Sequence, residues 1–196
     1  MILALLALVA PAAASDIPLS GFEGHPRAQL PLRVWAQAAG DAQLDAAVRR
    51  AIDDWNALFH EALGLDAFTP GAAREMAQVR VNLEPPTAGG PMGVTFLHTD
   101  DSGIIELPVS ITAAGPTARG QTSRETLLYQ VVAHELGHAL GLPHVRDPRS
   151  LMCCEPGAVD FNDPAAREVY VEARRHPDVR SVRAELVAHY TRFWRR

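Results

Sequence analysis

The sequence predicts an α+β fold, a single domain in which short strands and longer helices share one core. The chain has 196 residues, which is enough for one well-packed domain and hardly enough for two. Hydrophobic residues make up 47% of it and charged residues 21%, as in ordinary globular proteins. Stretches with alternating apolar residues lie between longer stretches with helical spacing, and this mixture predicts both kinds of element.

The first part of the chain is predicted to form a strand, a helix and three further strands. A strand is predicted at residues 30–37. A helix capped by Asp41 then runs to Gly64, because its apolar residues recur three and four positions apart. Three more stretches are predicted as strands, the last two separated by an Asp-Asp-Ser-Gly turn: 79–83, 94–98 and 104–111.

Three helices are predicted in the remainder of the chain. A capping box at residues 122–125 (Thr-Ser-Arg-Glu) starts a helix that runs to Gly141. Asp163, which is followed by a proline, starts another helix that ends near residue 175. An arginine-rich helix is predicted at 179–193, where apolar residues again recur at helical spacing.

The pattern H-E-x-x-H-x-x-G-x-x-H, from His134 to His144, has the spacing of a three-histidine catalytic zinc site. On a helix, His134 and His138 lie one turn apart on one face and can both bind an ion about 2.0–2.1 Å away. Gly141 lets the chain leave the helix in a conformation that other residues resist, so that His144 can return as the third ligand. Glu135 follows the first ligand and can reach a metal-bound water without binding the metal.

The full pattern is specific. In a chain of this composition, a chance match is on the order of one in ten thousand. We therefore reject the alternative of a helix with two unrelated histidines.

Met152 lies eight positions after His144, at the end of the segment H-V-R-D-P-R-S-L-M. Here the chain resembles the metzincin family of zinc endopeptidases, and within it the matrixins, which typically continue the third histidine with Asp-Pro and then Leu-Met at this spacing. The resemblance implies that Met152 forms the "Met-turn", a hydrophobic floor beneath the zinc. An ordinary core methionine would differ little from this physically.

The metzincin resemblance also implies the architecture. The expected fold is a mostly parallel twisted sheet with an antiparallel edge strand, an active-site helix, the Met-turn and C-terminal helices. Residues 15–196 would form one catalytic domain, with a cleft between an upper part (about 28–141) and a lower part (about 142–196). Family members bind substrate as an added strand, and residues 104–110 are our expected edge strand because Pro108 is tolerated best at an edge.

Two adjacent cysteines, Cys153 and Cys154, follow Met152 where matrixins tend to have Tyr-Pro. Adjacent cysteines rarely pair with each other, so we expect a bridge to another chain, metal binding or free thiols. By the resemblance, their position implies a place in the wall of the substrate pocket, with inert packing as the alternative.

Other polar residues carry weaker signals. His98 and Asp100 faintly resemble the start of a structural zinc site, but residues 99–133 contain no histidine to complete it. Calcium at Asp100 and Asp101 would need further oxygen ligands and is otherwise unsupported, so a solvated turn is the preferred interpretation. Four further histidines are expected at the surface: His25, His60, His176 and His189.

The N-terminal residues 1–14 resemble a secretory signal. Their apolar run is shorter than the roughly 17–25 residues that span a bilayer, and an A-x-A site precedes Ser15. An uncleaved anchor is the alternative. All 18 basic residues are arginine, which we take to indicate a GC-rich bacterial genome, and the formal charge of −5 argues against nucleic-acid binding. We expect a secreted or periplasmic monomer without stable membrane insertion.

The predicted function is that of a secreted zinc-dependent endopeptidase acting on protein or peptide substrates. One catalytic Zn²⁺ would be held by the three histidines. A zinc-bound water would give a proton to Glu135, the general base, and attack the peptide carbonyl. Two alternatives use the same scaffold: a non-proteolytic zinc-binding module, and a hydrolase of a non-protein amide such as a cell-wall peptide.

Overall fold

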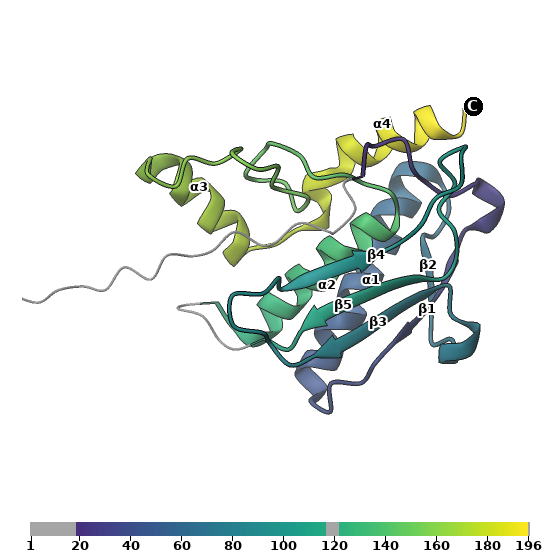
Figure 1. Ribbon diagram of the computed structural model, residues 1–196, viewed down its shortest axis with the longest axis horizontal. Helices are drawn as coiled ribbons and strands as arrows, with labels where there is room; N and C mark the ends of the chain where they lie inside the picture. The colour runs from purple at the N-terminus through teal and green to yellow at the C-terminus, as the bar shows by residue number, and fades with distance from the viewer. Residues whose placement is uncertain (1–18, 117–121, 196) are drawn as a thin grey trace, which may run out of the picture.

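A computed structural model of the chain describes residues 19–116 and 122–195. The expected signal segment, residues 1–14, lies outside the described residues. Figure 1 shows a twisted sheet in front of two long helices, α1 and α2, with α3 and α4 at the top of the view. No helix among the described residues is long and apolar enough to cross a membrane.

The sheet has five strands in the order β2-β1-β3-β5-β4. Neighbouring strands are parallel except for β4, which pairs antiparallel with β5 at one edge. This arrangement confirms the predicted fold class. The strands have these bounds: β1 Leu32–Ala36, β2 Phe68–Pro70, β3 Val79–Glu84, β4 Gly93–Phe96 and β5 Val109–Ala114.

The prediction that residues 104–110 form the edge strand is wrong. The strand in this region, β5, begins only at Val109 and lies between β3 and β4, so that β4 is the edge strand. Pro108 has no N–H to donate to a ladder, and pairing with β3 starts at the next residue, where Val109 N donates to Gln78 O at 2.9 Å. Proline therefore marks the start of an interior strand here.

Helix α1 (Ala42–Leu63) begins and ends as predicted. The Asp41 carboxylate accepts hydrogen bonds from the N–H groups of Gln43 and Leu44. Gly64 ends the helix with a φ of 77°, a left-handed conformation that glycine adopts without a steric penalty. The buried face of α1 packs on α2, and the wholly buried Trp55 donates from Nε1 to Ala133 O at 2.8 Å.

Helix α2 (Arg124–Ala139) begins one residue later than the predicted capping box implied. Its N-cap is Ser123, whose hydroxyl accepts from the N–H of Thr126. An N-cap oxygen bonds the N–H two or three residues further on, so a helix that starts at Arg124 requires the cap at Ser123 and not at Thr122. The remaining helical elements are α3 (Pro164–Arg175), α4 (Arg183–Phe193) and the 3₁₀ turns η1 (Arg27–Gln29), η2 (Arg74–Met76) and η3 (Val179–Val182).

The C-terminal prediction is confirmed for α3, which is capped by Asp163, and modified for the segment after it. The predicted single helix at 179–193 starts as the 3₁₀ turn η3 and continues as α4. One large hydrophobic cluster joins buried residues of the sheet, α1, α2, η3 and α4. The helix α2 lies inside this cluster, so side chains on it are held by packing from several directions.

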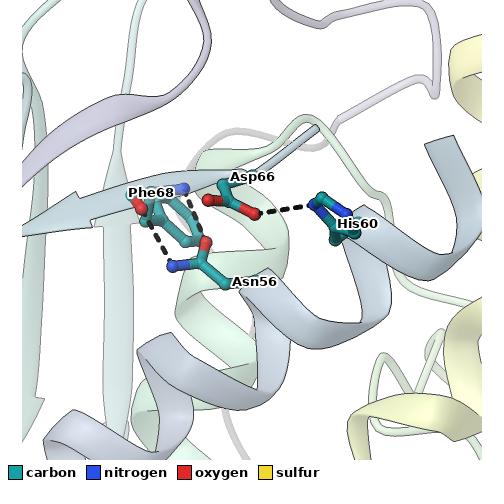
Figure 2. Close-up of polar contacts among 4 residues, drawn as sticks. All are labelled: Asn56, His60, Asp66 and Phe68. Atoms are coloured by element: carbon teal, nitrogen blue, oxygen red, sulfur yellow. Dashed lines mark hydrogen bonds and ion pairs between the residues drawn. The ribbon is translucent and has the colours of Figure 1, made fainter. Parts of the chain in front are cut away.

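The short strand β2 was not predicted, and a side chain of α1 holds it in place. Asn56 accepts from Phe68 N at 2.8 Å and donates to Phe68 O at 2.9 Å, as a neighbouring strand would (Figure 2). The nearby pair His60–Asp66, also drawn in Figure 2, is 3.2 Å apart but both side chains are more than half exposed. We expect that exposed pair to contribute little to stability.

Replacing Asn56 with leucine should lower the free energy of unfolding by about 1–3 kcal/mol, because two backbone groups of Phe68 lose their partner. The matched control is His60→Ala on the same helix, which should change it by less than about 0.5 kcal/mol. Urea unfolding of both variants measures the difference. Equal effects of the two substitutions would show that Asn56 does not anchor β2.

Candidate metal centre

Three histidine side chains meet at the C-terminal end of α2, as the motif predicts. His134 and His138 lie one turn apart on the helix, and His144 returns to them from the loop that follows. The Nε2 atom of His144 lies 3.1 Å from Nε2 of His134 and 3.2 Å from Nε2 of His138. Tetrahedral zinc with bonds of about 2.0–2.1 Å needs ligand separations of about 3.3 Å, so the spacing fits this metal.

Backbone carbonyls orient two of the rings. Nδ1 of His134 is 2.8 Å from Leu151 O, and Nδ1 of His138 is 2.8 Å from Leu142 O. A carbonyl oxygen only accepts, so each Nδ1 carries the hydrogen and each Nε2 turns a lone pair toward the centre. Converging lone pairs repel one another unless a cation lies between them, and the donor set therefore fits a bound metal ion.

Burial keeps the three rings neutral, which is the form that binds metal. It holds the pKa of His134 well below its ordinary value and lowers the pKa of His138 to about 4, with the neighbouring histidines adding to both shifts. The pKa of His144 is lowered by the same cause. Among the described residues, these three form the single group of His, Cys, Asp or Glu side chains arranged to hold a metal ion.

Gly141 has the role that the motif predicts. Its φ is 85°, and its N–H donates to His138 O at 2.8 Å while Leu142 N donates to Gly137 O at 3.0 Å. A Cβ at this position would overlap the backbone of Glu23. Both the left-handed conformation and the close approach require glycine at this turn. The turn brings Leu142 O to the ring of His138 and His144 to the other two histidines.

Glu135 lies on the side of α2 that faces the edge strand β4. The Thr95 hydroxyl is 2.7 Å from Glu135 Oε2 and 3.1 Å from its backbone oxygen. Burial raises the pKa of the Glu135 carboxyl to about 7, and the bond from Thr95 opposes the shift. A Cβ on Gly93 would lie 2.6 Å from Glu135 Oε1, so glycine in β4 leaves space for the carboxylate.

Met152 is completely buried directly beneath α2. A Cβ on Gly137 would overlap its sulfur, so glycine at this position of the helix allows α2 to lie close to the Met152 side chain. Val145 N donates to Met152 O at 3.0 Å, which joins the loop after His144 to the turn at residues 150–152. The preceding residue, Leu151, supplies the carbonyl that orients His134.

The expectation that Cys153 and Cys154 do not pair with each other is wrong, since the structure joins them in a disulfide across a cis peptide bond. The chain has only two cysteines, so each is the other's sole partner within the chain. Cys153 is buried in a small cluster with Val159 and Tyr170, whereas Cys154 is half-buried. A place in the pocket wall stays a prediction.

Arg174 of α3, which no sequence motif indicated, holds this loop in place. Its guanidinium donates to Pro148 O and Ser150 O at 3.4 Å and to Cys153 O at 3.1 Å, and it lies over the Tyr170 ring. One side chain thus satisfies three carbonyls on both sides of Met152. No local pattern distinguishes Arg174 from the other arginines of the chain, because its partners lie more than 20 residues away.

The prediction of four surface histidines is half wrong. His60 and His176 are exposed, but His25 and His189 are buried, at 0% and 4% exposure. The reason is tertiary. The segment before β1, which contains His25, packs against the C-terminal residues of the helix that contains His189, and the His25 ring bonds Ala139 O of α2. Burial lowers the pKa of His25, and it lowers the pKa of His189 to about 4.

Asp100 lies in an exposed turn, in agreement with the solvated turn that the sequence favours. Its Oδ1 accepts from the N–H and hydroxyl of Ser102 and from the N–H of Ile104 at 2.7–2.9 Å. Its carboxylate is therefore used within the turn itself. Nothing among the described residues supports a calcium site here.

Comparison with known proteins agrees with the geometry of the site. The family model of the matrixins (Peptidase_M10) matches residues 34–157, more than half of the chain. Macrophage metalloelastase of Oryctolagus cuniculus is 51% identical over 37 residues, which cover 19% of this chain and 8% of that protein. The chain thus matches only a small part of this curated relative. The extent of the family match, together with the three-histidine centre, shows that the chain belongs to the matrixin family.

Proposed function

We propose that this protein is a zinc-dependent endopeptidase that hydrolyses peptide bonds in protein or peptide substrates. One observation carries the proposal: Nε2 of His144 lies 3.1 Å from Nε2 of His134 and 3.2 Å from Nε2 of His138, and the buried Glu135 follows His134 in the helix. Membership of the matrixin family supports the same activity. His134, His138 and His144 would hold one Zn²⁺, and the fourth position would be left for substrate or water.

Zinc, when bound at such a site, acts as a Lewis acid on a carbonyl oxygen and makes water acidic enough to react near neutral pH. Glu135 would act as the general base and take the proton of the attacking water. With a pKa of about 7, it is partly ionised at neutral pH and can later release the proton to the leaving amine. Because Thr95 bonds Oε2, we assign the proton transfer to Oε1.

We further propose that the protein is exported, with cleavage before Ser15, and that it acts outside the cytoplasm. The support is the apolar segment 1–14 with its small residues before the cut. N-terminal sequencing of material recovered from the periplasm or medium should begin at or near Ser15. Recovery of chains that begin with Met1 would contradict this and favour a retained anchor.

Purified protein should contain one zinc per chain, and His138→Ala should lose most of it, because the substitution removes one of three ligands. Protons compete for the same nitrogens, and a low histidine pKa means that they compete only in acid. The apparent zinc affinity should therefore change little from pH 7.5 to 6 and fall steeply only as the pH approaches about 4. Elemental analysis and chelator competition measure both effects. Full zinc retention in His138→Ala would refute the assignment.

Glu135→Gln should keep a near-normal zinc content while lowering turnover of casein by at least about 10²-fold, the usual scale for loss of a general base. Glu75→Gln, at an exposed glutamate, is the matched control and should retain full activity. An active Glu135→Gln variant would exclude the proposed role. A parent protein that binds zinc but cleaves neither casein nor a broad peptide library would instead favour a non-proteolytic module or another amide substrate.

Replacing both Cys153 and Cys154 with serine should change the cleavage preference more than the zinc affinity, if this loop lines the pocket that receives the residue after the cut bond. The three histidines already complete the protein's share of the metal site. Peptide-library profiles of parent and variant, each with and without reductant, measure the effect. Reductant should change only the parent. Loss of zinc from the variant would contradict the pocket-wall position.

A further inference from the structure

The backbone carbonyls at the C-terminal end of α2 are bonded by side chains from distant parts of the chain. The last carbonyls of a helix have no partner within it. Here Ala139 O lies 2.8 Å from Nε2 of His25, and Leu140 O accepts from the Tyr190 hydroxyl at 3.0 Å. One partner comes from the segment before β1 and the other from α4. Both are completely buried.

His25 is itself held in a fixed position. Its backbone oxygen accepts from Trp194 Nε1 at 3.0 Å, and Nδ1 lies 3.2 Å from Oε1 of the Gln29 side chain. The preceding residue, Gly24, forms a bridge with Ile104 in the loop before β5. Since Ala139 O can only accept, Nε2 of His25 carries the hydrogen. The ring therefore donates from Nε2 to Ala139 O, and contacts on three sides set its direction.

The turn that follows Ala139 carries the parts of the metal centre that α2 does not supply. Gly141 packs so closely on the backbone of Glu23 that it has no room for a Cβ. The next residue supplies Leu142 O, which orients His138, and two residues later comes His144. A displacement of the end of α2 would therefore move the ligand His144. It would also move Leu142 O, the carbonyl that orients the ligand His138.

We propose that His25 is a positioning residue for the metal centre: its bond to Ala139 O, supported by that of Tyr190 to Leu140 O, fixes the end of α2 and so sets the affinity for zinc. The inference rests on the proposed zinc site. The segment before β1 supplies none of the three histidine ligands, but through His25 it would influence the geometry of the site. His25 does not touch the metal or the substrate in this proposal.

The test compares His25→Leu with His25→Gln, whose amide nitrogen can take the place of Nε2. His25→Leu should weaken zinc binding about three- to tenfold, less than the 10–100-fold typical of a group bonded directly to a ligand. His25→Gln should restore most of the affinity. Tyr190→Phe removes only a hydroxyl and should weaken binding about two- to threefold. His60→Leu, at an exposed histidine, is the control and should bind as the parent does.

Two measurements separate positioning from general stability: chelator competition for Zn²⁺, and the visible spectrum of the Co²⁺-substituted protein, which reports ligand geometry. A changed Co²⁺ spectrum in His25→Leu that is restored in His25→Gln supports the proposal. Unchanged affinity and spectrum overturn it, even if the metal-free variant unfolds more easily. If His25→Leu does not fold, Tyr190→Phe becomes the deciding variant, and an unchanged zinc affinity together with an unchanged Co²⁺ spectrum in Tyr190→Phe overturns the proposal. A parent that binds no zinc refutes the proposed function and this inference with it.

Discussion

The two hydrogen bonds from ligand histidines to backbone carbonyls, His134 to Leu151 O and His138 to Leu142 O, determine the geometry of the metal centre. They select the tautomer in which Nε2 is free to bind an ion. They also require the chain after α2 to return twice, first at the glycine turn and then at the turn of Met152. The close approach of Gly137 to Met152 belongs to this return, and Gly141 at the first turn packs on Glu23 of the segment before β1.

The burial of α2 encloses several polar groups, and each of them needs a hydrogen-bond partner. Trp55 bonds Ala133 O, Thr95 bonds the Glu135 carboxylate, and His25 bonds Ala139 O. These partners come from α1, from the edge strand and from the segment before β1. Burial makes an unsatisfied polar group costly. The same burial keeps the histidines neutral and raises the pKa of Glu135, so both the need for hydrogen-bond partners and the shifted pKa values follow from the burial of α2.

The loop below the site depends on α3 in a comparable way. It contains little regular structure, and its carbonyls would otherwise need water or one another as partners. Arg174 satisfies three of them, and the small cluster of Cys153, Val159 and Tyr170 packs beneath. The disulfide between adjacent cysteines lies in this braced segment, immediately after the methionine that supports α2.

Local patterns in the sequence determined the parts of this protein that depend on neighbours within a few residues. Helix periodicity places His134 and His138 on one face, Asp41 and Asp163 cap their helices, and Gly141 allows the turn to His144. The resemblance to matrixins added the parallel sheet with its antiparallel edge. Tertiary structure alone decided which strand lies at that edge, that Asn56 creates β2, that His25 and His189 are buried, and that Thr95 and Arg174 reach the site. Each of these depends on contacts between residues far apart in the chain, and residue spacing carries no information about such contacts.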